Sequence, residues 1–453
     1  MSKRFVRFLM AATVLTAGAF NAYAAKPAKY VDPDEAEATG AGFIATPVKK
    51  IEGKYYVITD FGVVNDSTVI QTAKIQAVID RAEAEGGGTI IVPEGTYLTG
   101  ALFFKPGTKL HISRGGVIKG SDDISNYPLI PSRMEGRSIY YYAAVINAYF
   151  VDNFAITGEG TIDGAAYKLW VAFWDRREQA RRENRVCTNL EVSRPRLVFL
   201  WGCDHVNISG TKFCNSAFWT MHLYQCTDVN ITNCSYHAPT KPVKAPSSDA
   251  IDIDVCRDVT IKGCYFNVND DSVCLKGGKG VYSNRSYESG MVENVLVEDC
   301  TFGPNNHGVL TLGSECVHAT GITVRNCRLE TNTALLRLKM RPDTYQIYEN
   351  VTVENITGTC GTIIDMKPWK QFFDLEGSTE KPFGIVRNIL IKDVDVSCRS
   401  LGTIAGNPDD QVENVKLENI KIKAETDTFE IAYPAPAVEL INVTINGHEV
   451  ANK

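Results

Sequence analysis

A four-residue phrase with aliphatic second and fourth residues recurs eight times between residues 205 and 417 of this 453-residue chain. It reads His-Val-Asn-Ile at 205–208 and Asn-Val-Lys-Leu at 414–417, with six copies between them. Successive copies are separated by 23, 30, 36, 27, 29, 38 and 26 residues. Because periods of about 20 to 50 residues are typical of solenoids, propellers and arrays, we expect a repeat protein.

The alternation inside each phrase distinguishes among repeat architectures. Apolar, often β-branched residues occupy every second position, which is the period of a strand and excludes a helical solenoid. A propeller would need about four strands in each blade of roughly 40 residues. Coils of about 22 residues with variable loops instead fit a right-handed parallel β-helix with a shared core. The predicted class is therefore all-β, with one domain over residues 25–453.

One helix is expected ahead of the strands. Asp66-Ser67-Thr68 offers N-cap oxygens, apolar residues follow at helical spacing, and Gly86-Gly87-Gly88 ends the run. The apolar positions are Val69, Ile70, Ala73, Ile75, Ala77, Val78 and Ile79. An isolated helix before a solenoid can cover the open end of its core. We therefore predict an N-terminal capping α-helix, within an arm and cap of about residues 25–88.

The first 24 residues have the pattern of a signal peptide. Three basic residues precede an apolar run at 8–20, and Ala22-Tyr23-Ala24 has the small-x-small form of a cleavage site. This run is too short to span a membrane, and no later stretch is long enough. We expect removal of residues 1–24 and a secreted protein, periplasmic or extracellular, without membrane insertion.

The net charge limits the kinds of partner that the protein is expected to bind, and the cysteines indicate core positions. A net charge of −6 without a basic stripe argues against nucleic acid as a partner, and we expect a monomer.

Thirteen cysteines are an odd number, so at least one is unpaired if the others form disulfides. Four of them occupy the place in the repeat that Ile356, Val394 and Ile420 take in later copies: Cys234, Cys264, Cys300 and Cys327. A position that accepts Cys, Ile or Val is most simply a core position. One or two disulfides remain open.

Two copies of the repeat carry a cluster of carboxylates. The stretch from Asp249 to Asp254 aligns with that from Asp271 to Lys276 at an offset of 22 residues. Stacked as parallel strands about 4.8 Å apart, the two stretches make Asp249 and Asp271 neighbours, with Asp270 beside them. Like charges at that distance separate their pKa values, as an acid and a base require. A Ca²⁺ site or turn-forming aspartates are alternatives that the spacing leaves open.

Further polar residues follow in the next two coils. Asn306-His307-Gly308 opens one coil, and Leu336 to Lys339 lies in the next. Because alternate strand residues face opposite sides, inward Leu336 and Leu338 turn Arg337 and Lys339 outward together. The cluster thus gains two cations and a histidine, although a self-neutralising surface ladder would have the same residues.

Four motifs in this order resemble those of the polygalacturonases of glycoside hydrolase family 28. The family's Asn-Thr-Asp, Asp-Asp, Gly-His-Gly and Arg-Ile-Lys correspond here to Ser247-Ser248-Asp249, Asp270-Asp271, Asn306-His307-Gly308 and Arg337-Leu338-Lys339. Two serines replace Asn-Thr, and Ala250 stands where the family usually has glycine. The resemblance implies a right-handed parallel β-helix that hydrolyses α-1,4 bonds between galacturonic acids of pectin, with inversion and without metal or cofactor.

The resemblance also assigns catalytic roles. Asp270 is the expected general acid, while Asp249 and Asp271 hold and deprotonate the attacking water, and His307 completes the catalytic set. Inversion requires room for that water between acid and base. Mutual repulsion among the three carboxylates is expected to raise the pKa of the acid.

Substrate binding is expected from four residues. Arg337 and Lys339 can each bind the carboxylate of a uronic acid, which favours galacturonan over neutral glycans. Trp219 and His222 lie one coil before Asp249 and could line a sugar subsite. The alternative for this second pair is a packed aromatic ring and its hydrogen-bonded neighbour.

Insertions near the motifs predict the mode of attack. They lie at 165–195, 277–290 and 341–349, and a further one lies at 367–384. Loops on one face of a repeat protein commonly wall its binding site. A helical charged run at 174–185 of the first insertion carries cations suited to a terminal uronate: Arg176, Arg177, Arg181 and Arg182. We therefore expect exo attack on a chain end, against the alternative of inconsequential surface loops.

Three other functions remain alternatives at this point. Rhamnogalacturonan and xylogalacturonan hydrolases share the fold and part of the motif set. A Ca²⁺-dependent pectate lyase also uses this fold, and Asp249, Asp252 and Asp254 could supply its carboxylates. A non-catalytic β-helix that binds polysaccharide would have no reason to carry all four motifs in order.

Overall fold

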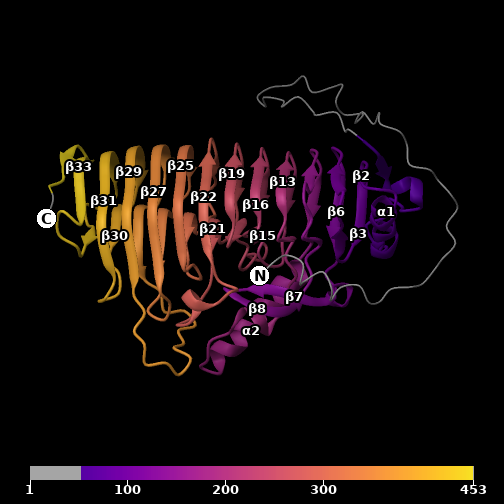
Figure 1. Ribbon diagram of the computed structural model, residues 1–453. Helices are drawn as coiled ribbons and strands as arrows, with labels where there is room; N and C mark the ends of the chain where they lie inside the picture. The colour runs from indigo at the N-terminus through magenta and orange to yellow at the C-terminus, as the bar shows by residue number, and fades with distance from the viewer. Residues whose placement is uncertain (1–52, 452–453) are drawn as a thin grey trace, which may run out of the picture.

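The structure is a computed structural model that describes residues 53–451. The predicted signal peptide, and the arm that we expect between it and the cap, lie outside the described residues. Within them, two long sheets run side by side along a right-handed parallel β-helix, as predicted (Figure 1). One continuous hydrophobic core extends between the sheets from Tyr56 to Ile445.

The sheet of 11 strands carries the predicted motifs. In spatial order from the N-terminal end it contains β4 (Leu102–Phe104), β9 (Ile146–Tyr149), β12 (Val198–Trp201), β15 (Met221–Tyr224), β18 (Ile251–Asp254), β21 (Asp271–Lys276), β24 (Gly308–Leu312), β26 (Ala334–Met340), β28 (Thr362–Pro368), β30 (Ser400–Ile404) and β32 (Glu430–Ile431).

The sheet of 21 strands closes the other side of the coils. Its members are β1 (Tyr55–Val57), β2 (Gly88–Val92), β3 (Gly95–Thr99), β5 (Thr108–Ile112), β6 (Gly116–Gly120), β10 (Ala155–Thr157), β11 (Thr161–Asp163), β13 (Asp204–Ser209), β14 (Lys212–Cys214), β16 (Thr227–Thr232), β17 (Ser235–His237), β19 (Arg257–Lys262), β20 (Tyr265–Asn267), β22 (Met291–Glu298), β23 (Thr301–Phe302), β25 (His318–Glu330), β27 (Gln346–Thr359), β29 (Gly384–Cys398), β31 (Gln411–Ala424), β33 (Val438–Ile445) and β34 (His448–Glu449).

The repeated phrase stacks in register through this larger sheet. Val206 pairs with Val229, and the series continues strand by strand to Val415, as the eight copies predict. The structure adds a ninth copy, in which Val438 pairs with Val415. One aliphatic ladder thus runs along the core and aligns the coils.

The cysteines behave as core residues. Cys234, Cys264, Cys300 and Cys327 are buried, and Cys327 pairs in register with Ile356, the residue predicted to be its equivalent. All thirteen cysteines fall within the described residues and all are free, so the question of one or two disulfides is answered in the negative. Stacked thiols here fill the volume that aliphatic side chains fill in later coils.

The predicted capping helix is present, but it begins later than expected. Helix α1 (Thr72–Ala84) packs on β2 and β4 at the N-terminal end of the solenoid (Figure 1). Val69 and Ile70 lie before it and are exposed, and its N-cap residue is Gln71. The side-chain amide of Gln71 accepts a hydrogen bond from the backbone N–H of Val64 and donates one to its carbonyl. These two bonds hold the segment before the helix in a turn. The Asp66 carboxylate instead accepts hydrogen bonds from the backbone N–H and the hydroxyl of Thr68, so it does not cap the helix.

The remaining helix and a hairpin project from one side of the solenoid (Figure 1). Helix α2 (Tyr167–Arg182) begins seven residues before the predicted charged run, because Trp170 and Phe173 bury its first turns. The hairpin consists of β7 (Leu129–Met134) and β8 (Arg137–Tyr142), an antiparallel pair that the sequence analysis missed. Another prediction was wrong at its boundary, since residues 346–349 belong to β27 rather than to a loop. Neither α-helix of the described chain is long and apolar enough to cross a membrane.

Candidate active site

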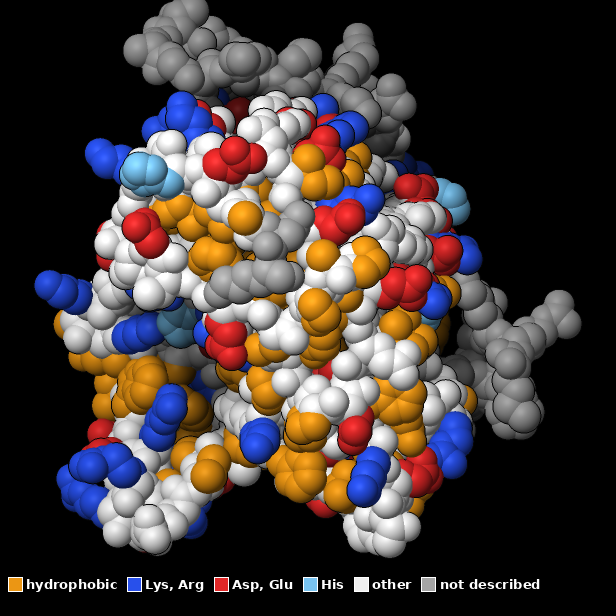
Figure 2. Space-filling model, turned by 90° about the vertical axis from the view of Figure 1, so that its left-hand side faces the viewer, with side chains coloured by type: hydrophobic (Ala, Val, Ile, Leu, Met, Phe, Trp, Pro, Cys, Tyr) orange, Lys and Arg blue, Asp and Glu red, His pale blue; other side chains and the backbone are white. Residues whose placement is uncertain are grey.

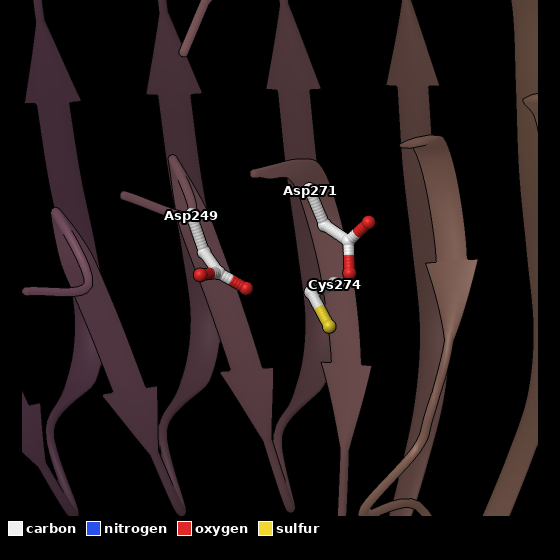
Figure 3. Close-up of side chains that lie close together, drawn as sticks. All are labelled: Asp249, Asp271 and Cys274. Carbon is white, nitrogen blue, oxygen red and sulfur yellow. The ribbon is translucent and has the colours of Figure 1, made fainter. Parts of the chain in front are cut away.

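The predicted alignment of the two aspartate stretches is confirmed. β18 pairs with β21 so that Ile251 faces Val273 and Ile253 faces Leu275, the offset of 22 residues. These four aliphatic side chains lie in the core and fix the register. Asp249 and Asp271 consequently stand near the starts of adjacent strands with their carboxyl groups on one side (Figure 3). One oxygen from each, with the Cys274 thiol, lies within a mutual distance of 4.8 Å.

Asp270 is the most accessible carboxyl group of the three. Its side chain is 32% exposed, whereas Asp249 is 5% exposed and Asp271 is 1% exposed. His307 donates its backbone N–H to the Asp270 carbonyl at 3.0 Å, and its Nδ1 lies 3.7 Å from the Asp270 carboxylate. A group that is to protonate a leaving oxygen must reach the solvent side, and Asp270 meets that requirement.

Lys244 is a candidate site residue that sequence reasoning missed. Its Nζ lies 3.0 Å from Nε2 of His307, on the side of the ring away from Asp270. Trp174 of α2 donates its indole N–H to the Lys244 carbonyl at 2.7 Å, so the helix positions this lysine. No motif contains Lys244, and only the fold brings the loop after β17 to His307.

Arg337 and Lys339 face the cluster as their parity predicts. Leu336 and Leu338 lie in the core, and the two cations project from the opposite side of β26. Lys339 Nζ lies 2.6 Å from one oxygen of Asp271, and Arg337 Nη1 lies 3.7 Å from the other. Lys339 also lies over the ring of Trp369, 4.8 Å from its centroid. Both cations therefore contact the buried carboxylate of Asp271 rather than forming a solvated surface ladder.

The surroundings of the two buried aspartates, Asp249 and Asp271, shift their pKa values in opposite directions. Burial alone would raise the pKa of Asp271, but the charges of Lys339 and Arg337 outweigh it and hold that pKa well below its usual range. For Asp249, burial raises the pKa well above its usual value, and the neighbouring charges of Asp270 and Asp252 add to the effect. At neutral pH Asp271 is an anion, while Asp249 keeps a proton more readily. The pKa values of this pair are thus separated, but burial and the two cations are the main causes rather than the expected repulsion between carboxylates.

A buried ion network lies directly behind these groups. Lys276 Nζ lies 3.3 Å from Asp252 and 3.4 Å from Glu315, and it stacks 4.4 Å from the centroid of the Trp219 ring. Burial raises the pKa of Asp252 to about 7 in spite of Lys276. For Glu315 the charges of Lys276 and Arg341 overcome burial and lower the pKa to about 2.

Trp219 and His222 are packed residues in this structure. His222 is 0% exposed, and its Nε2 lies 3.4 Å from Asp254 while the ring packs on Phe199. Burial lowers the pKa of His222 to about 3, so the ring is neutral. Trp219 stacks on Phe218 and is 4% exposed. Of the two predicted alternatives, the geometry fits the packed aromatic and its hydrogen-bonded neighbour, and His222 has no surface with which to contact a sugar.

The donor set of the aspartate cluster fits Ca²⁺ poorly. The third donor, after Asp249 and Asp271, is the Cys274 thiol, whereas Ca²⁺ takes hard oxygen ligands. Burial raises the pKa of Cys274 well above its usual value, and its sulfur lies 3.1 Å from the Gly313 carbonyl. The carboxylate of Asp271 already contacts two cations, Lys339 and Arg337. Two of the carboxylates expected for a Ca²⁺-dependent lyase are also engaged by cations, Asp254 by Arg133 and Asp252 by Lys276, which disfavours that alternative.

The outer face of the 11-stranded sheet is covered toward the N-terminal end and open toward the C-terminal end. The hairpin β7–β8 contacts β15 and β18 through Arg133, and the outward side chains of β12, β15 and β18 are buried: Phe199, His222, Tyr224, Asp252 and Asp254. Arg133 of the hairpin binds Asp254 at 2.9 Å and lies over the Tyr224 ring. Beyond the aspartates, Asp365 is partly exposed and Lys367 is 54% exposed. The sheet face is therefore covered on the N-terminal side of the aspartates, so that a substrate groove along it would be closed at that end.

Contacts between loops hold the closed side together. Asn189 donates a hydrogen bond of 2.7 Å to Glu135 at the tip of the hairpin. Arg137 of the hairpin pairs with Glu376 of the loop after β28. Arg285, from the loop after β21, binds Glu380 at 2.7 Å. Figure 1 shows the hairpin, α2 and the orange loop after β28 on the same side, and Figure 2 shows two projections there with a notch between them. The predicted loop wall is thus formed by segments more than 200 residues apart.

The arginines of α2 are engaged elsewhere. Arg176 pairs with Glu191 at 2.8 Å, Arg181 and Arg182 both pair with Glu178, and Arg177 lies over the Trp174 ring. These contacts lie on an exposed helix surface, which is the usual place for such pairs. The prediction that they meet a terminal uronate has no support in this geometry.

Comparisons with known proteins point to one family. The family model described as Glycosyl hydrolases family 28 matches residues 91–440. A protein named probable polygalacturonase from Vitis vinifera is 26% identical over 410 residues, covering 85% of this chain and 77% of that protein. An exopolygalacturonase from Zea mays is 26% identical over 332 residues, 70% of each chain. The crystal structure of an exopolygalacturonase from Thermotoga maritima matches with a TM-score of 0.73 at 25% identity, covering 89% of this chain and 94% of that one.

Proposed function

The chain belongs to glycoside hydrolase family 28, and from that membership we propose that it hydrolyses α-1,4 bonds of polygalacturonate from a chain end, releasing single galacturonic acids. The similar polygalacturonase and exopolygalacturonases support the substrate and the mode of attack. The reaction takes place outside the cytoplasm if the predicted signal peptide is used.

The closed end of the groove carries the proposal of exo attack. The hairpin β7–β8 buries the sheet face over β15 and β18, immediately beside Asp249. An endo enzyme needs a groove open at both ends, because the polymer must continue past the site in both directions. Here a chain can enter from the β26 to β30 side only, so its end must stop near the aspartates.

Exposure and charge support distinct roles for the three aspartates. Asp270, the accessible carboxyl, protonates the glycosidic oxygen as it leaves. Asp271, the anion, accepts a proton from the attacking water, which Asp249 helps to orient from the adjacent strand. Attack by that water on the face opposite the leaving group gives inversion.

The two cations link substrate recognition to the chemistry. Lys339 and Arg337 can bind the carboxylate of a uronic acid through charge-assisted hydrogen bonds. Both also neutralise Asp271 in the free enzyme. A bound uronate shares these cations with Asp271, so the pKa of Asp271 rises in the complex and the carboxylate becomes a better base. A neutral sugar would not produce this change.

Early products from long polygalacturonate test the proposal. Monomer alone, accompanied by new reducing ends and a slow fall in viscosity, is expected, and added chelator should leave the rate unchanged. A ladder of mid-length oligomers with a rapid fall in viscosity would contradict exo attack. An unsaturated product absorbing in the ultraviolet, lost with chelator, would instead identify a lyase.

A further inference from the structure

A cavity of about 360 Å³ lies on the open side of the catalytic coil. His307 and Arg337 border it toward the aspartates, and Asp365, Lys367 and Arg399 line it farther along the solenoid. These last three residues belong to none of the four motifs. The cavity therefore extends from the proposed catalytic centre in the direction that the groove leaves open.

The charges that line this cavity are unbalanced. Asp365 is its only carboxylate, and it lies 2.6 Å from Lys367 and 3.6 Å from Arg337. Arg399 adds a third cation, and no hydrogen bond or ion pair joins its guanidinium to a residue of the described chain. Because Arg337 also approaches Asp271 and Lys367 contacts Asp365, Arg399 is the cation of this lining that no carboxylate among residues 53–451 neutralises, which suits the site to an anion.

Arg337 supplies a second observation at the same place. Its Nε is buried and has no hydrogen-bond partner among residues 53–451, although Asp365 lies nearby. A buried donor without a partner is costly, and such groups commonly mark a position that a ligand or water fills. The guanidinium thus offers a donor to the cavity in addition to the Nη1 that approaches Asp271.

Spacing places Arg399 beyond the sugar that the motif cations would hold. Arg337 lies on β26, β28 follows it, and Arg399 immediately precedes β30, two coils farther on. With about 4.8 Å between coils, the two strands are roughly 10 Å apart. Arg399 is therefore positioned for a second sugar on the open side.

We propose that this cavity is a uronate subsite, in which Arg399 binds the carboxylate of the sugar beyond the one bound by Arg337 and Lys339. The inference rests on the proposed function, because only a substrate with a carboxylate on successive sugars can use both positions. Arg399 is then a determinant of chain-length preference, selecting galacturonan chains over shorter or alternately neutral ones.

The test compares substrates of two lengths. Arg399→Gln should lower the ratio of kcat/KM for trigalacturonate to kcat/KM for digalacturonate about tenfold, the effect of one charged hydrogen bond. Arg399→Lys should recover part of the ratio because it restores the charge. Arg328→Gln is the matched control, an exposed arginine that pairs with Glu330 on β25 of the other sheet.

Two outcomes would overturn the inference. One is an unchanged ratio in Arg399→Gln, and the other is an equal loss of the ratio in the Arg328 control. Neither outcome touches the proposed function, which fails separately if the wild-type enzyme cleaves neither substrate. Since Arg399 is exposed, circular dichroism of the variant is expected to match that of the wild type.

Discussion

The tie between Arg133 and Asp254 is predicted to hold the closed end of the groove in place. Both side chains are 0% exposed, and their atoms lie 2.9 Å apart. Arg133→Met keeps much of the side-chain volume over the Tyr224 ring but leaves Asp254 as a buried charge whose remaining side-chain hydrogen bond is to neutral His222. Breaking a buried pair in this way costs about 3–5 kcal/mol.

The pH dependence of this loss follows from the pKa of Asp254. Burial opposes ionisation, but Arg133 and the hydrogen bond from His222 overcome it and lower the pKa of Asp254 to about 2. An unfolded aspartate titrates near pH 3.9, so the pair stabilises the wild type fully above that pH and loses its contribution as pH falls toward about 2. Without Arg133 the pKa of Asp254 rises, and the difference between variant and wild type should be largest near pH 7.

Denaturant unfolding at pH 7 and pH 4, followed by tryptophan fluorescence, measures both effects. The double variant Arg133→Met, Asp254→Asn removes the unpaired charge and should recover more than half of the lost stability at pH 7. A loss below about 1 kcal/mol in the single variant, or a double variant no more stable than the single one, would contradict a stabilising role for the Arg133–Asp254 pair.

Two substitutions at the site test the proposed roles. Asp270→Asn should lower kcat on polygalacturonate by about 10²-fold or more with unchanged unfolding, because an amide cannot protonate the leaving oxygen, and undiminished turnover would contradict its role. Lys339→Met should raise KM steeply for galacturonides, because a uronate loses one of its two cations. An equal change for neutral and uronate substrates would argue against carboxylate recognition by Lys339.

The parts of the fold that repeat could be predicted from the sequence. Each coil repeats the same pattern of inward-facing residues. The register of Asp249 with Asp271 therefore follows from the alternation within each strand and from the offset of 22 residues between the two stretches. The side toward which Arg337 and Lys339 point follows from the same alternation. A core position filled by Cys, Ile or Val in different coils was also recognisable without a structure.

The parts of the structure that depend on contacts between distant segments could not be predicted from the sequence. Arg133 meets Asp254 across 121 residues, and nothing local marks either as a buried partner. The hairpin did leave one signal, the pair Glu135-Gly136 between its two strands, and both of these turn residues have positive φ. Lys244 left none, because its place beside His307 depends on how Trp174 of α2 packs.

Cleavage of hexagalacturonate shows whether the three aspartates work at the closed end of a groove. The first products, sampled before one tenth of the substrate is consumed, are expected to be monomer and pentamer in equal amounts. Dimer with tetramer, or trimer alone, would require the chain to pass beyond the aspartates on both sides and would exclude a closed end.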